Sequence, residues 1–513
     1  MISEKEKINE AVNGKQLTLL FDGENLGEVS EEFSLPDYQA EVSRIVCVRP
    51  QFLLENRYIH DTGAGVSLDY GGTVTYSVIY ISSDGELCAV PLSSTYENKI
   101  ALSDMPELCK LSVRCESASF RVSAPRRLTI KTKLKSRIRA FKELKVESKI
   151  SPSSLADEVF LEKNEKTIEA IEVKGISLKG IKMSESLDCP SGLVKPIWCD
   201  AFVSIGEVKS ENGCVRVQGE ATVKCLISTE TGEEVVEKSM RLNEQIEADG
   251  AEIGDFVSVS PTCTALALSS EEKEGETKLY FDLTCEINGE VIRNGEKKIL
   301  ADAYSTKHKS SIAYKEFEYY NALKAGNSSF TVCEEKKRNG RDGEEIVCAM
   351  GDAVWERSEI KGTKVNHLGK LSVSVIMRNE DAIDNEKYSL EAYELPIKYE
   401  QELGKNIKNS LSICDFSLGA VSIKQENERA FITAEVYSAT EIFEKNTESA
   451  LSELNIRTDE EIKNERSCVR VCFTNEGETL WDVAKRYNAS LSKIANQNEL
   501  DKSATELPKY LII

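Results

Sequence analysis

The sequence is poor in the residues on which most catalytic and metal centres depend. Its 513 residues contain three histidines, His60, His308 and His367, and no Cys-x-x-Cys pair. No histidine has a second His or a Cys at metal-ligand spacing, which argues against zinc. The chain also lacks a P-loop, a GxSxG elbow, an HExxH helix and a dinucleotide fingerprint. We therefore expect a protein that is not an enzyme, with no catalytic residue, no metal and no cofactor.

The chain also lacks long apolar runs and a basic surface. No run approaches the roughly 18 apolar residues that a transmembrane helix needs, and the first ten residues are highly charged rather than like a secretory signal. The formal net charge is −22, which argues against nucleic-acid binding and against adhesion to anionic membranes. These features predict a protein that stays in the cytoplasm.

Cysteine is plentiful but scattered. Four of the fifteen cysteines, Cys47, Cys225, Cys285 and Cys348, lie within strand-like apolar stretches. Isolated cysteines in such stretches behave as small hydrophobic residues. The sequence thus favours free buried thiols over a disulfide framework.

Three segments of the chain resemble one another. Each has a strand pattern that begins with a glycine, at Gly72, Gly219 and Gly369, about 150 residues apart. An Ile-x-Cys landmark precedes each glycine, at residues 45–47, 197–199 and 346–348. Repeats of this length are domains rather than solenoid units.

Within each repeat, apolar and polar residues alternate with the period of a β-strand. The pairs Asp84-Gly85, Thr231-Gly232 and Asn288-Gly289 are typical of hairpin turns. The sequence predicts a mainly β protein, with three tandem antiparallel sandwich-like repeats followed by a small βααβ module. The predicted parts are repeat 1 (1–148), repeat 2 (149–300), repeat 3 (301–443), a polar linker with a short helix at 450–454 (444–467), and the module (468–513).

The module shows the clearest local signals. Val469, Val471 and Phe473 alternate with polar residues as one face of a strand does. Thr479 is a helix cap, Asn488 suits a left-handed helix end, and Ser490 starts a second helix. The inward residues of the two helices are Leu480, Val483, Ala484 and Tyr487, then Leu491, Ile494 and Ala495, and residues 511–513 form the closing strand.

These residues resemble the LysM domain, which usually binds glycans that contain N-acetylglucosamine. The resemblance rests on the Gly-acid-Thr-Leu-Trp turn at 477–481, Val483-Ala484, Tyr487, Asn498 and Pro508. The chain departs from the family where Glu478 replaces the usual Asp and where Pro508-Lys509-Tyr510 replaces the usual Pro-Gly-Gln. That last loop forms one wall of the family's sugar groove, so the change weakens the expectation of sugar binding.

Three β repeats with a C-terminal LysM domain resemble the SPOCS-domain proteins of spore-forming Firmicutes, and among them the SipL family of clostridial spore coat morphogenetic proteins. The resemblance implies a non-enzymatic adaptor in the mother-cell cytoplasm, at the forespore surface. Its partner would be the spore coat morphogenetic ATPase of the SpoIVA type, which forms the coat basement layer. In that family the LysM domain is implicated in the protein–protein contact.

Two sets of residues are candidate binding surfaces. The loops of the module can carry a protein or a glycan, or serve only as turns and caps; Trp481 can stack on a ligand or fill the core. The basic stripe of the first repeat can dock an acidic partner, or form the solvated face of a strand. The first set is Gly477, Glu478, Thr479, Leu480, Trp481, Asn498, Glu499, Leu500, Pro508 and Lys509; the second is Lys131, Lys133, Lys135, Arg137 and Arg139.

Two functions thus remain open at the level of sequence. The first is the coat adaptor. The alternative is a protein that binds peptidoglycan or spore cortex through N-acetylglucosamine polymers. A wall hydrolase is a third hypothesis, because a pair of acidic residues leaves no motif, but the repeats and the module account for nearly all of the chain.

Overall fold

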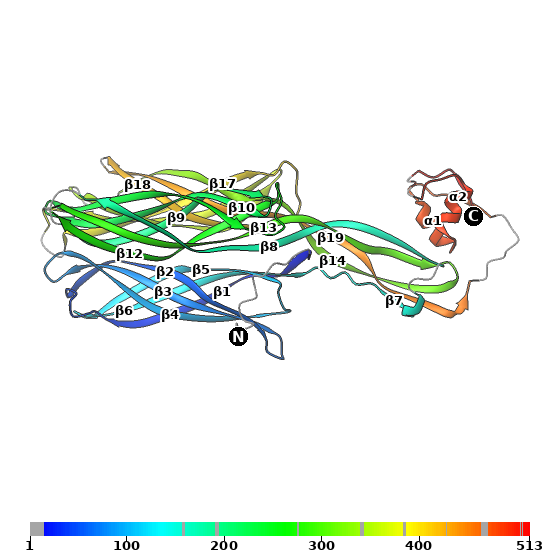
Figure 1. The fold of residues 1–513 in the computed structure, drawn as a ribbon, viewed down its shortest axis with the longest axis horizontal. Coiled ribbons are helices and arrows are strands. Elements are labelled where there is room, and N and C mark those ends of the chain that lie inside the picture. Colours follow the sequence, from blue (N-terminus) through cyan, green and yellow to red (C-terminus); the bar gives the residue numbers. More distant parts are fainter. Residues whose placement is uncertain are drawn as a thin grey trace. The chain divides into compact units, whose positions relative to one another are not determined.

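The computed structural model describes residues 15–155, 160–189, 194–273, 276–338, 343–382, 386–426, 428–462, 470–502, 504 and 506–513. They form two compact units (Figure 1). The larger unit comprises Met1–Glu143, Ile171–Arg293 and Asn321–Glu444, and the smaller comprises Leu144–Ala170, Asn294–Tyr320 and Lys445–Ile513. Four long strands contribute residues to both units: β8 (Leu161–Asp188), β13 (Glu276–Ser305), β14 (His308–Lys337) and β19 (Arg429–Glu461).

The larger unit contains three modules of six strands each, which confirms the predicted antiparallel β repeats. In the described residues each module has two sheets: β1-β6-β5 with β2-β3-β4, β12-β13-β8 with β11-β10-β9, and β14-β19-β18 with β15-β16-β17. A short strand at Lys149–Ser151 adds a fourth strand to the sheet β14-β19-β18. The first module consists of β1 (Leu17–Ser34), β2 (Val42–Asp61), β3 (Val66–Ser82), β4 (Leu87–Leu102), β5 (Leu108–Ala124) and β6 (Arg127–Glu143). The remaining strands are β9 (Lys195–Glu211), β10 (Cys214–Thr229), β11 (Gly232–Glu247) and β12 (Phe256–Lys273) in the second module, and β15 (Glu345–Lys361), β16 (Lys364–Arg378), β17 (Tyr388–Glu402) and β18 (Ser410–Glu426) in the third.

The predicted alternation places one face of each central strand in the core of its module. On β3, Val74, Tyr76, Val78 and Tyr80 are all completely buried. They pack with residues of the facing sheet such as Ile130. Burial of such side chains is the main force that closes each sandwich.

The glycine that begins each repeated strand pattern has a common structural cause. A Cβ on Gly72 or Gly219 would lie 2.0 Å from a backbone carbonyl oxygen of the neighbouring strand, and one on Gly369 would lie 2.3 Å from such an oxygen. In every case the pairing register shifts close by, as at a β-bulge. Only glycine allows this close approach of two backbones.

The three Ile-x-Cys landmarks meet where the modules of the larger unit contact one another. Val46, Trp198 and Val347, the central residues of the landmarks, belong to one buried apolar cluster. Each module also forms hydrogen bonds with both others: Arg49 Nη1 to Asp200 Oδ2 (3.1 Å), Lys224 Nζ to the Ala349 oxygen (3.0 Å), and Arg114 Nη1 to the Trp355 oxygen (2.8 Å). The three modules therefore form a closed group.

The smaller unit corrects two predictions. Residues 444–461, predicted as part of a polar linker with a short helix, belong to strand β19. Ala450, Leu451 and Leu454 are buried against other strands of this unit. The short strand β7 (Lys149–Ser151) pairs in parallel with residues 453–455, and a 3₁₀ turn at Ser153–Leu155 follows it. The segment looked like a linker because the residues between its apolar ones are mostly polar.

A hairpin prediction also fails in the second module. Asn288-Gly289 does not turn the chain but lies within β13, where it pairs with Val259 and Ser260 of β12. A Cβ on Gly289 would lie 2.3 Å from the Ser258 oxygen. Close backbone packing, and not a turn, requires this glycine. The turns at Asp84-Gly85 and Thr231-Gly232 are as predicted.

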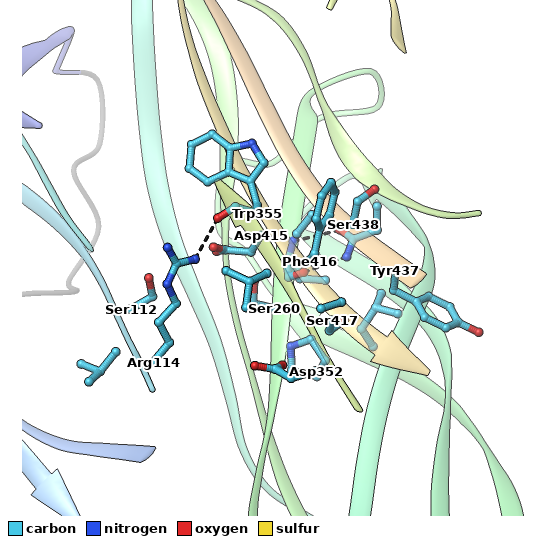
Figure 2. A pocket seen from close by; sticks show the side chains of 18 residues that line it. Ser112, Arg114, Ser260, Asp352, Trp355, Asp415, Phe416, Ser417, Tyr437 and Ser438 are labelled. Carbon is cyan, nitrogen blue, oxygen red and sulfur yellow. Dashed lines mark hydrogen bonds between the residues drawn. The ribbon is translucent and has the colours of Figure 1, made fainter. Parts of the chain in front are cut away.

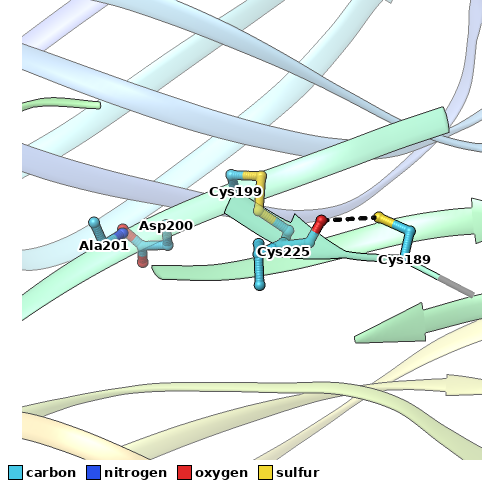
Figure 3. The surroundings of a disulfide bond; sticks show 6 residues. Cys189, Cys199, Asp200, Ala201 and Cys225 are labelled. Carbon is cyan, nitrogen blue, oxygen red and sulfur yellow. Dashed lines mark hydrogen bonds between the residues drawn. A yellow bond between two sulfur atoms is a disulfide. The ribbon is translucent and has the colours of Figure 1, made fainter. Parts of the chain in front are cut away.

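The expectation of free cysteines fails for one pair. Cys199 and Cys225 are opposite each other on β9 and β10 and form a disulfide bond (Figure 3). Among the other described cysteines, Cys47, Cys109, Cys285 and Cys414 are examples of free thiols, and Cys468 lies outside the described residues. Burial raises the pKa of several thiols, for example Cys109 to about 11. Such thiols stay protonated and unreactive near neutral pH.

Candidate functional site

The C-terminal βααβ segment of the smaller unit holds the first candidate surface. It consists of β20 (Val471–Phe473), α1 (Leu480–Arg486), α2 (Leu491–Gln497) and β21 (Tyr510–Ile512). The predicted inward residues Leu480, Val483, Ala484, Ile494 and Ala495 are indeed buried. On β20 it is Cys472 that points into the core. Val471 and Phe473 share a face as predicted, but that face is exposed, and Val469 lies outside the described residues.

The first loop is built on local hydrogen bonds. Gly477 has φ +80°, which suits a residue without a Cβ. Glu478 accepts a bond from the Asn475 amide (3.0 Å) and pairs with Arg486 (2.8 Å). Thr479 forms a capping box with Asp482, each side chain bonding the other's backbone amide. The Glu478 and Thr479 side chains therefore shape the loop, while Gly477 and Thr479 stay exposed.

The second loop follows α2. Asn498 donates to the Ile494 and Ile512 oxygens (2.8 and 2.7 Å), and its Oδ1 accepts from the Ile512 amide (2.8 Å). The Asn498 amide thus fastens strand β21 to the helix. Glu499 has φ +55° and an exposed side chain, and Leu500 packs partly against the core. Of these three predicted binding residues, Glu499 is the one whose side chain is exposed.

Pro508 and Lys509 lie beside Thr474, at the start of the first loop. The Thr474 hydroxyl donates to the Pro508 oxygen (2.7 Å), and the Thr474 amide donates to the Lys509 oxygen (3.2 Å). Both side chains are exposed. Because Phe473 pairs with Tyr510, the loop after β20 and the loop before β21 leave the same end of the sheet. The structure therefore brings 477–479 and 508–509 to one end and places Asn498 at the other.

Trp481 lies on the side of α1 that contacts strand β13. Its ring is partly buried and packs edge-on against Tyr304, with 5.0 Å between ring centroids. Its Nε1 donates to Asp302 Oδ2 (2.8 Å). Sequence reasoning missed Asp302 and Tyr304, because residues 179 positions apart in the chain show no local signal for this contact.

The outer face of the two-stranded sheet is apolar. The cross-strand pairs Val471–Ile512 and Phe473–Tyr510 form it. The side chains of the first pair are 55% (Val471) and 38% (Ile512) exposed, and those of the second are 70% (Phe473) and 58% (Tyr510) exposed. Four large apolar side chains on one small face are more than the scattered exposed residues of an ordinary surface.

This segment is a small βααβ module whose loops lie on a packed core. A family model for the LysM domain matches residues 475–507. No curated protein and no solved structure matches the chain. Among the described residues, none of the helices combines the length and apolar character needed to cross a membrane.

The basic stripe on β6 finds acidic partners within its own module. Lys131, Lys135, Arg137 and Arg139 pair with carboxylates of β1 at 2.6–3.4 Å. Arg137 and Arg139 also stack on Trp355 of the third module, at 4.7 and 5.4 Å. Lys131 and Lys133 are exposed. Most of the stripe therefore stabilises the larger unit.

A second candidate site is a cavity of about 320 Å³ where the three modules of the larger unit meet (Figure 2). Its wall includes Ser112, Ser260 and Asp415 from strands β5, β12 and β18, together with Asp352. The protein around the cavity keeps bulk water away from Asp352 and Asp415, and this desolvation raises the pKa of both carboxyls above the ordinary value. In the described part of the chain, no three His, Cys, Asp or Glu side chains gather as metal ligands.

A buried ionic cluster also joins the modules. Lys110 of the first module pairs with Glu290 of the second (3.0 Å) and Glu441 of the third (2.6 Å). Burial raises the pKa of Glu290 to about 7, although Lys110 opposes the change. One cation thus serves two carboxylates from different modules.

Proposed function

We propose that this chain is a non-catalytic adaptor that recognises a protein partner through its LysM domain. The observation that carries the proposal is the exposed apolar face of β20 and β21. Apolar patches of this kind, flanked by polar residues, are typical of protein-binding surfaces. Arg470 and Lys509 are exposed beside it, so a partner with an acidic rim would fit.

The resemblance of the whole sequence to SPOCS-domain proteins supplies the finer proposal. In this proposal the partner is the coat basement-layer ATPase of the SpoIVA type, and the chain tethers the coat to the forespore surface from the mother-cell cytoplasm. The three β modules would serve as a rigid scaffold. The core of each module is packed with apolar side chains, and ion pairs join the modules, which suits that role.

The test is a pull-down of the coat ATPase from the same genome with the full-length chain. We expect Phe473→Glu with Tyr510→Glu to reduce capture at least tenfold, because two charges would enter the apolar face. Ile253→Glu is the matched control, since Ile253 is 76% exposed in the larger unit. Equal capture by all three proteins would refute the role of this face.

A second function is favoured by the family match at residues 475–507, since LysM domains usually bind N-acetylglucosamine polymers. The exposed residues Gly477, Thr479, Pro508 and Lys509, which lie at one end of the two-stranded sheet, are the candidate sugar contacts. This function predicts that the full chain sediments with peptidoglycan, and that Lys509→Glu weakens sedimentation while the Phe473 and Tyr510 changes do not. Sedimentation with peptidoglycan, together with no capture of the ATPase, would favour the glycan.

A further inference from the structure

Helix α1 of the LysM domain is bound by its own chain. Asp302, near the end of β13, accepts hydrogen bonds from Trp481 Nε1 (2.8 Å) and from Lys485 Nζ (2.7 Å). The Tyr314 hydroxyl of β14 donates to the same carboxylate (2.7 Å) and accepts from Lys485 (2.9 Å). One carboxylate thus collects three donors, two of them from α1.

Tyr304 completes the apolar core of the LysM domain from outside its sequence. It is 2% exposed and packs with Leu480, Val483 and Ile494. Its hydroxyl donates to the Ala489 oxygen (2.8 Å), in the turn between the two helices. Residues 475–507 therefore do not contain their whole core.

Charge and hydrogen bonding stabilise the contact between Asp302 and α1. Burial alone would raise the pKa of Asp302, but the bonds from Lys485, Trp481 and Tyr314 hold it below its usual value. Burial alone would lower the pKa of Lys485, but its bonds to Asp302 and Tyr314 raise it above the ordinary value. Both groups are therefore charged across the neutral range, and a charged pair with hydrogen bonds on both sides is the stronger kind.

We propose that Asp302, Tyr304 and Tyr314 form a latch that fixes the LysM domain by α1 and decides which of its faces a partner can reach. The latch closes the side of α1 that carries Trp481 and Lys485. The apolar face of β20 and β21 and the exposed loop residues Glu499, Pro508 and Lys509 stay open. Only this last consequence depends on the proposed recognition function; the latch itself does not.

The latch is tested by amide hydrogen exchange on the full-length chain, with no ligand present. We expect Asp302→Ala and Tyr304→Ala each to speed exchange in α1 at least tenfold. Glu460→Ala is the matched control. It also removes a carboxylate from ion pairs of the same unit, but the partners of Glu460 are Lys309 and Arg457, which lie outside α1. Exchange within twofold of the unaltered protein in both latch variants would overturn the inference.

A charge swap separates a latch from a general loss of folding. Asp302→Lys should open the contact, and adding Lys485→Asp should restore at least part of the α1 protection. If Asp302 served only to stabilise β13, a change on α1 would not rescue it, and failure of rescue would count against the latch. Acrylamide quenching gives a second readout. Trp198 and Trp355 are buried in the larger unit, so an opened latch should increase quenching of Trp481.

Discussion

Replacing Glu290 by glutamine should make the larger unit more stable at alkaline pH. Glu290 shares Lys110 with Glu441 in a cluster that draws on all three modules. In the folded protein, burial raises the pKa of Glu290 from 4.5 to about 7. Between these two values the unfolded chain loses the proton while the folded chain keeps it. The free energy of unfolding therefore falls as the pH rises through this window.

The size of the effect follows from the change in pKa. A change of about 2.5 corresponds to about 3 kcal/mol, at roughly 1.4 kcal/mol for each factor of ten. At pH 5, just above the pKa of the unfolded chain, the glutamine variant should be more stable by less than about 1 kcal/mol. At pH 8 the variant should be more stable by up to about 3 kcal/mol, because glutamine carries no charge that burial opposes.

The assay is guanidinium unfolding of the full chain at several pH values and constant ionic strength, followed by tryptophan fluorescence. Two of the three tryptophans, Trp198 and Trp355, belong to the larger unit. Glu237→Gln is the matched control, because this residue is exposed on β11, and it should leave the pH dependence unchanged. If Glu290→Gln and the original protein ran parallel from pH 5 to 8, the cluster would not have the assigned charge state.

Three further predictions concern single residues. Burial lowers the pKa of His367 to about 4, so the free energy of unfolding should fall as the pH drops from 6.5 to 4; His367→Gln should remove that part of the slope in the same unfolding assay. Gly219→Ala should lower the free energy of unfolding by about 2–4 kcal/mol, because its Cβ would lie 2.0 Å from the Ser204 oxygen. Gly206→Ala, with open space at its Cβ, should change it by less than about 0.5 kcal/mol. Equal melting temperatures of the two variants would contradict the bulge argument. Asn498→Ala should destabilise the LysM domain by about 1–3 kcal/mol, because it removes the hydrogen bonds to β21. Asn496 is exposed, so Asn496→Ala should leave the stability unchanged. Amide hydrogen exchange in α2, compared between the two variants, tests this difference.

Much of the larger unit could be predicted because its signals are local. A period of two identified the strands, and the recurring glycine marked equivalent strands in all three modules. The landmark at 45–47 could be matched to its copies by its Ile-x-Cys residues and by its place before each glycine. What failed was the interpretation of single dipeptides: Asn288-Gly289 has the residues of a turn, but neighbouring backbone packing decides its conformation.

The smaller unit could not be predicted because its parts are far apart in the sequence. Its strands come from 144–170, 294–320 and 445–461, and the polar residues among them conceal the apolar ones. The LysM fold itself was evident from Gly477, Thr479 and the helix spacing. Its attachment to Asp302 was not, since neither a charge nor a tyrosine in a distant strand indicates a partner before the chain is folded.

The closed contacts among the three modules fix their copy number. In an open array each end offers a surface on which another repeat can stack, so duplication can lengthen the protein. Here each module already bonds to the other two, through Arg49, Lys224 and Arg114, and the landmark residues fill the shared centre. A fourth copy would find no vacant contact there, and a protein with two would leave the centre open to water. Insertions or additional domains would therefore have to attach outside the three modules, at their loops or at the chain termini.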